Sequence, residues 1–174
     1  SKVYKNPNNF IDVGIDDDIR HSPYSGEFVD NMDLTISKDG ESDFFPKRIL
    51  GGTLAERYSS SSAKPSMLSN KSRQPVNYYS IISSVVNSIL ISEDAEDIKE
   101  PIDVSCFVCL PPVEITGNNE NEDYVKEQLL GSYRVKLNKM DREIEFNIKD
   151  VSVYAESVLA VVAFLFNQDA TQRT

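Results

Sequence analysis

Residues 101–163 constrain the fold more than any other part of this 174-residue chain. They begin with an almost unbroken run of apolar and small residues, Ile102–Leu110, which is typical of a central strand covered on both faces. A Leu110-Pro111 turn and an amphipathic segment (DYVKEQLLGSY) follow. Residues 133–148 then alternate in two apolar stretches around a short polar turn, which predicts a β-hairpin. This order predicts an α/β fold, a mixed sheet with helices packed on it.

Two segments have the pattern of helices that cover such a sheet. Apolar side chains between residues 76 and 91 recur at helical spacing, and Pro75 stands where a helix tolerates proline. Residues 157–166 (SVLAVVAFLF) are apolar throughout, and we expect a helix there because Ser157 can cap it.

The N-terminal part predicts shorter elements. Residues 10–15 (FIDVGI) read as a short strand that ends at a glycine turn, and residues 28–37 as a half-exposed strand. Residues 59–75 are rich in Ser, Lys and Pro, which is typical of a loop or an inserted subdomain. We therefore expect one domain over residues 1–174, with a small subdomain near 41–74.

The net charge of the chain indicates which classes of partner it is not expected to bind directly. The chain carries 28 acidic and 18 basic residues, a net charge of −10. A negative surface disfavours direct binding to nucleic acid or to an anionic membrane. No apolar run approaches the roughly 20 residues of a membrane span, and only two cysteines occur. We therefore expect a cytoplasmic protein.

The landmarks of residues 75–165 resemble the first domain of ParM-type bacterial and phage actin-like proteins. In that family a strand runs into a Leu-Pro turn, and a helix, a hairpin and a helix start of the form hydrophobic-x-V-x-x-E-S follow. The corresponding positions here are Leu110-Pro111, Gly131 and the run from Val153 to Glu156-Ser157. The resemblance implies a fold of the actin/ribonuclease H type with a small inserted subdomain.

The resemblance also implies nucleotide-site residues. Actin-like ATPases carry Asp-x-Gly in their first strand, where the glycine admits phosphate and the aspartate positions a metal ion through water. Asp12 and Gly14 match this pattern and imply ATP with magnesium, with Asp12 as the residue for the metal. The three carboxylates of residues 16–18 depart from it, because they repel a polyphosphate. Asp30, in FVDNMDLTISKDG, is a second candidate position that lacks the glycine.

Glu156 is the third site residue that the resemblance implies, because this glutamate opens the helix beneath the nucleotide cleft in ParM-like proteins. Its place in a first helical turn is also explained by the helix dipole alone. Cys106 and Cys109 are predicted to be buried small residues, because zinc needs four ligands and no second pair exists. His21, the one histidine, has no nucleophile motif and is predicted to lie in a surface loop.

The function implied is a filament-forming protein that moves plasmid or phage DNA through an adaptor. Only half of the nucleotide site is present, because the family's second phosphate strand and second domain would follow Thr174. ATPase activity is therefore expected only if a second domain completes the site. Two alternatives stay open: a non-enzymatic actin-like adaptor, capping or scaffold module, and a structural phage-type protein without nucleotide.

Overall fold

A six-stranded mixed sheet forms the centre of the computed structural model, which describes residues 9–21, 27–59, 70–92, 101–115 and 119–157. The strand order is β1-β3-β2-β5-β6-β4. In chain order the strands are β1 (Phe10–Val13), β2 (Asn31–Lys38), β3 (Lys47–Gly52), β4 (Ile102–Leu110), β5 (Gly131–Leu137) and β6 (Arg142–Ala155). All neighbours are antiparallel except β4 and β6, which run parallel.

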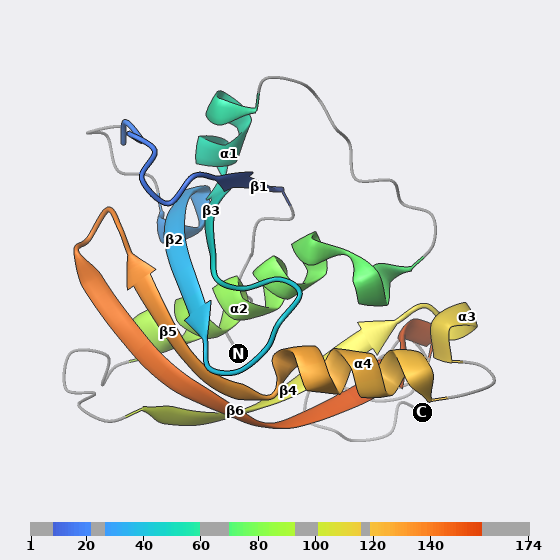
Figure 1. Ribbon diagram of the computed structural model, residues 1–174. Helices are drawn as coiled ribbons and strands as arrows, with labels where there is room; N and C mark the ends of the chain where they lie inside the picture. Colours follow the sequence, from blue (N-terminus) through green and yellow to red (C-terminus); the bar gives the residue numbers. More distant parts are fainter. Residues whose placement is uncertain (1–8, 22–26, 60–69, 93–100, 116–118, 158–174) are drawn as a thin grey trace, which may run out of the picture.

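The α-helices lie near the two ends of this sheet and across one of its faces (Figure 1). They are α1 (Thr53–Tyr58), α2 (Pro75–Leu90), α3 (Pro112–Ile115) and α4 (Glu120–Leu129). Two short 3₁₀ helices, η1 (Phe28–Asp30) and η2 (Lys71–Arg73), precede β2 and α2. No helix of the described ranges is long and apolar enough to cross a membrane.

The main core lies between the sheet and the helices α2 and α4. Alternate residues of β2, β5 and β6 point into it, as the period of two requires. Tyr78, Ile82 and Val86 of α2 meet them at helical spacing. The strand residues are Met32, Leu34, Ile36, Tyr133, Val135, Leu137, Ile144, Phe146 and Ile148, each buried. The expected helix over 76–91 and the expected hairpin are therefore confirmed.

A smaller apolar cluster covers the other face of β3. Leu50 meets Ile19, Leu54 and Ala55, with Ile11 and Val13 of β1 packed beside them. Near β2 and β3 both faces of the sheet are therefore covered by apolar side chains, whereas Arg134 and Lys136 of β5 face solvent. Lys47–Gly52, which falls within the subdomain expected near residues 41–74, pairs within this main sheet.

A buried ion pair lies on the same face of the sheet as Leu50, because Asp33 is the register partner of Leu50. The Asp33 side chain is fully buried and the Arg48 side chain is 9% exposed. Arg48 donates from Nε and Nη2 to the two carboxylate oxygens of Asp33, at 2.9 and 2.8 Å. It also donates from Nη1 to the carbonyls of Ile15 and Asp17. The guanidinium therefore ties the loop after β1 to the centre of β2.

Two further side chains complete this network. Asn138 Nδ2 donates to Asp33 Oδ1 at 2.8 Å, and His21 Nε2 lies 2.7 Å from Asp33 Oδ2. Burial alone would raise the pKa of Asp33, but the hydrogen bonds from Arg48, Asn138 and His21 hold that pKa below its ordinary value. His21 lies in a loop, as predicted, but its side chain is only 25% exposed because its ring contacts a buried carboxylate.

Two strand predictions also need correction. Residues 102–110 form the last strand of the sheet within the described residues, not a central one. Their apolar side chains cover α2 on one face, while Phe107 on the other face is 71% exposed and stacks on Tyr154. β6 also continues through Val153 to Ala155, so only Glu156 and Ser157 of the expected helix start are helical. Most of the helix expected over 157–166 lies outside the described residues.

Removal of the Arg48 guanidinium tests the buried network. Arg48→Ala leaves the Asp33 carboxylate buried with fewer hydrogen bonds, and breaking a buried pair in this way costs about 3–5 kcal/mol. We expect the free energy of unfolding, measured by urea denaturation, to fall by that amount. Arg134→Ala is the matched control, because Arg134 pairs with Glu143 and Glu145 on the exposed face. Equal effects of the two variants would contradict the role given to Arg48.

Acid titration tests the same carboxylate. Because its folded pKa is depressed, the stability that Asp33 contributes is present above its ordinary pKa of 3.8 and is lost as the pH falls through the folded value. We expect Asp33→Asn to be less stable than the natural chain at pH 7 and to lose less stability on acidification. Thermal unfolding between neutral pH and pH about 2 measures how the stability of the natural chain and of the variant changes with pH. Asp39→Asn, at an exposed turn, should leave the slope unchanged.

Candidate functional site

The carboxyl ends of the parallel strands β4 and β6 lie side by side. Leu110 is the register partner of Ala155, and each strand runs on into a polar segment. Pro111 and α3 follow β4, while Glu156 and Ser157 follow β6. Ligands of α/β proteins bind outside the carboxyl ends of parallel strands, because chain segments diverge there. This edge is therefore the part of the sheet best placed to hold a ligand.

Glu156 lies at this edge and is paired with a cation. Lys71 Nζ donates to Glu156 Oε1 at 2.6 Å, and the two side chains are 39% and 46% exposed. An ion pair as exposed as this contributes about 0–1 kcal/mol. Both charges are therefore free to exchange this contact for one with a ligand.

A buried carboxylate positions Lys71. Glu114 of α3 is 5% exposed and accepts hydrogen bonds from the backbone N–H groups of Lys71 and Ser72, at 2.6 and 2.8 Å. The start of η2 is thereby fixed against α3, which follows β4. Sequence reasoning missed Glu114 and Lys71, although a Glu two residues after the Leu-Pro-Pro turn is a signal, since a buried carboxylate there must find a partner.

A second basic residue of η2 lies close to α4. The guanidinium of Arg73 lies over the ring of Tyr124, 3.5 Å from its centroid, and its Nη2 is 3.8 Å from Glu120 Oε1. The Tyr124 hydroxyl donates to Asp43 Oδ2 at 2.6 Å. This edge thus has two cations, Lys71 and Arg73, and each lies near an exposed carboxylate, Glu156 and Glu120 respectively.

Asp12 and Gly14 lie at the opposite end of the sheet, on and just after β1. The Asp12 carboxylate is 3.2 Å from Lys47 Nζ. The Gly14 N–H donates to Asp17 Oδ2 at 2.7 Å, and a Cβ at Gly14 would meet Asp17 Oδ1 at 2.7 Å. A carboxylate of this chain therefore occupies the place beside Gly14 that a phosphate oxygen would take.

The structure does not bring the three predicted residues together. β3, β2 and β5 stand between β1 and β6 in the sheet. Adjacent strands are about 4.8 Å apart, so β1 and β6 are roughly 19 Å apart along a flat sheet. Asp12 and Glu156 therefore lie on different parts of the sheet within this chain. Asp30, the second candidate position, is exposed at the end of η1.

The other chemical candidates carry no site. Cys106 is buried, as predicted, whereas Cys109 is only half-buried, and both are free thiols. Burial raises the pKa of the Cys106 thiol. No cluster of three or more His, Cys, Asp or Glu side chains within the described ranges has the geometry to hold a metal ion. A metal bound at Glu156 would therefore need ligands from a nucleotide or from outside these residues.

No family model matches the chain, and no curated protein matches its sequence. Among solved structures the chain is similar to the actin-like protein Alp7A, with a TM-score of 0.64, 17% identity, and coverage of 98% of this chain and 44% of that one. It is also similar to apo ParM of Bacillus thuringiensis, with a TM-score of 0.55, 17% identity, and coverage of 93% of this chain and 42% of that one. For apo pSK41 ParM the TM-score is 0.58 and the identity 11%, with coverage of 94% of this chain and 46% of that one.

These matches extend over nearly all of this chain but over less than half of each structure that it matches. The mixed sheet, the parallel β4–β6 pair and the helices on the sheet agree with the fold that the sequence landmarks implied. The chain therefore has the fold of part of a ParM-type actin-like protein.

Proposed function

We propose that this chain is part of an actin-like protein that assembles into filaments and positions plasmid or phage DNA. The similarity to Alp7A over 98% of the chain is the single observation that carries this proposal. The sheet, its helix cover and the Leu110-Pro111 turn occur in the order that the ParM resemblance implies. The first partner that we propose is another copy of the same protein, with which it would associate into filaments.

ATP with magnesium is the proposed ligand. One of the matched structures is ParM of Bacillus thuringiensis with ATP, at a TM-score of 0.50 and 16% identity. We place the part of the site that this chain supplies at the carboxyl ends of β4 and β6. There Glu156 would face the magnesium-bound end of the nucleotide, and its partner Lys71, 2.6 Å away, would be available to a phosphate oxygen.

The site proposed here is only half of a catalytic one. This chain covers 40% of the ParM structure with ATP. Phosphoryl transfer depends on phosphate, metal and water being held together from several sides. We therefore propose weak nucleotide binding and negligible hydrolysis for these residues alone, with ATPase activity only when a second domain completes the site.

Asp12 and Gly14 form the competing location for the phosphates, with Asp12 as the residue that positions the metal. In its favour stands the Asp-x-Gly pattern of residues 12–14. Against it stands the Asp17 carboxylate on the Gly14 N–H. A phosphate would have to displace Asp17, and the carboxylates of residues 16–18 oppose that exchange.

The charge of the chain bears on its partners. A net charge of −10 favours attachment to DNA through a basic protein adaptor over direct contact, and it disfavours an anionic membrane surface. The free thiols of Cys106 and Cys109 fit the reducing cytoplasm, where we propose that the protein acts.

Titration with a fluorescent ATP analogue and magnesium tests the site. We expect Glu156→Gln to weaken binding several-fold, because the variant loses the charge at the proposed metal position, and Asp12→Asn to leave the affinity unchanged. Glu41→Gln, at an exposed position between β2 and β3, is the control for loss of one acidic charge. Light scattering with and without ATP measures assembly in the same samples.

Each outcome separates the alternatives. Loss of binding in Asp12→Asn alone would move the phosphates to residues 12–14 and contradict the Glu156 site. No binding up to millimolar nucleotide, together with no increase in scattering, would overturn the filament proposal in favour of a nucleotide-free adaptor, capping or structural module.

A further inference from the structure

Residues 70–72 have a backbone shape that is uncommon outside glycine. Asn70 has φ 65° and ψ 48°, in the left-handed region, although it carries a Cβ. Lys71 follows it as the first residue of η2. A left-handed residue followed by a right-handed one turns successive backbone N–H groups toward one point, which makes a concavity suited to an anion. The chain therefore builds a small anion-holding turn shortly before α2.

The anion in this turn is the carboxylate of Glu114. Its Oε1 accepts from the Lys71 N–H at 2.6 Å and its Oε2 from the Ser72 N–H at 2.8 Å. Both oxygens are thus used, and Glu114 is 5% exposed. The Glu114 backbone is held as well, since its carbonyl accepts from Asn121 Nδ2 of α4 at 2.9 Å. This carboxylate cannot shift without leaving a buried charge short of a partner.

The same turn places the Lys71 side chain. Lys71 Nζ reaches Glu156 Oε1 at 2.6 Å, but both side chains are well exposed, and an exposed ion pair holds neither partner firmly. The backbone is held more firmly, because Ser72 is fully buried and its carbonyl accepts from the Tyr78 hydroxyl at 2.6 Å. The position of the ammonium beside the ends of β4 and β6 therefore depends more on the buried bonds to η2 than on the ion pair.

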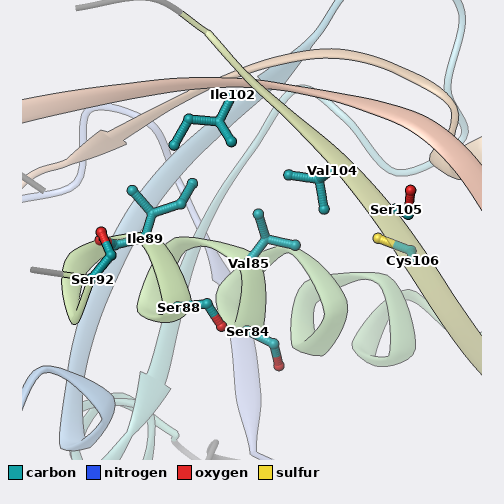
Figure 2. A pocket seen from close by; sticks show the side chains of 9 residues that line it. All are labelled: Ser84, Val85, Ser88, Ile89, Ser92, Ile102, Val104, Ser105 and Cys106. Atoms are coloured by element: carbon teal, nitrogen blue, oxygen red, sulfur yellow. The ribbon is translucent and has the colours of Figure 1, made fainter. Parts of the chain in front are cut away.

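An apolar groove between α2 and β4 offers no place for phosphates (Figure 2). It has a volume of about 400 Å³. Its apolar lining comes largely from Val85, Ile89, Ile102 and Val104. No charged residue of the described chain lines it, so an anion there would lose its hydration without gaining a cation. Of these two places, η2 is the one that offers a phosphate a positive charge.

We propose that Glu114 is a positioning residue for the proposed nucleotide site. Its carboxylate acts as the internal anion of residues 70–72 and holds Lys71 where the ammonium can bind a phosphate oxygen beside Glu156. This proposal rests on the proposed function and deepens it, because part of the affinity for phosphate is assigned to a residue that does not touch the ligand. A cation placed by buried bonds also has less freedom to lose when a ligand binds, which favours affinity.

Chemical labelling of lysine tests this placement without any nucleotide. A water-soluble N-hydroxysuccinimide ester acylates lysines, and peptide mass spectrometry gives the rate at each one. We expect Glu114→Gln to raise the rate at Lys71 several-fold, because one accepting oxygen becomes an NH₂ group and the ion pair with Glu156 loosens. The rate at Lys136, on the exposed face of β5, is the reference within the same sample and should not change. Glu41→Gln, at an exposed position, is the control for loss of one acidic charge.

Two substitutions of Asn70 test the same placement from the backbone. Glycine adopts the left-handed conformation at no steric cost, so Asn70→Gly should leave the acylation rate at Lys71 unchanged. A β-branched residue is strongly disfavoured there, so Asn70→Val should raise that rate as Glu114→Gln does. Because Asn70 is exposed, this pair of variants keeps the test decisive even if Glu114→Gln does not fold.

Nucleotide titration tests the consequence for the site. With a fluorescent ATP analogue and magnesium, we expect Glu114→Gln and Lys71→Met each to weaken binding several-fold. The double variant should bind no more weakly than Lys71→Met alone, because Glu114 acts only through Lys71. A residue that merely stabilises the fold would instead add its own loss to that of Lys71→Met.

Two results would overturn the proposal. One is an unchanged acylation rate at Lys71 in folded Glu114→Gln and Asn70→Val. The other is an additive loss of nucleotide affinity in the double variant. Absence of nucleotide binding in the natural chain would overturn the proposed function itself, and with it the phosphate role of Lys71. The acylation rates would still decide whether Glu114 places Lys71, so the two failures are distinguishable.

Discussion

The long strand β6 is the element on which the rest of the structure depends. Its first half pairs antiparallel with β5 through Ile148, and its second half pairs parallel with β4 through Ala155. One strand therefore joins the antiparallel part of the sheet to the parallel pair. β6 continues past the end of β5 (Figure 1). Glu156 follows its last residue, Ala155, which is the register partner of Leu110 at the carboxyl end of β4. The candidate site exists only because these two pairings share one strand.

The sequence predicted the elements better than their places in the sheet. The helix over α2 and the hairpin of β5 and β6 follow from periodicity, which depends on residues close in the chain. The position of β4 in the strand order could not be predicted in the same way. Its apolar run indicates burial, but the burial comes from α2 on one face, while Phe107 and Tyr154 stack in the open on the other. A pattern within one strand does not reveal which strands flank it.

The predicted site residues show the same limit. Asp12, Gly14 and Glu156 were chosen by their resemblance to family positions, and only the strand order reveals that three strands separate Asp12 from Glu156. Partners distant in sequence, such as Glu114 with Lys71 or His21 with Asp33, were also missed. Such contacts depend on tertiary structure, and no local pattern encodes them. Asp17 on the Gly14 N–H adds a second reason to doubt a strand motif read alone, because a side chain of this chain fills the ligand's place.

The strand order decides which residues share the candidate site, and interstrand nuclear Overhauser effects between backbone protons measure that order. The strand order predicts contacts between β4 and β6 near Val108 and Val153, and between β2 and β5 near Thr35 and Lys136. It predicts none between β1 and β4, which lie at opposite ends of the sheet. Contacts between β1 and β4 would contradict it, because they would place Asp12 beside the parallel pair and bring the three predicted residues into one site.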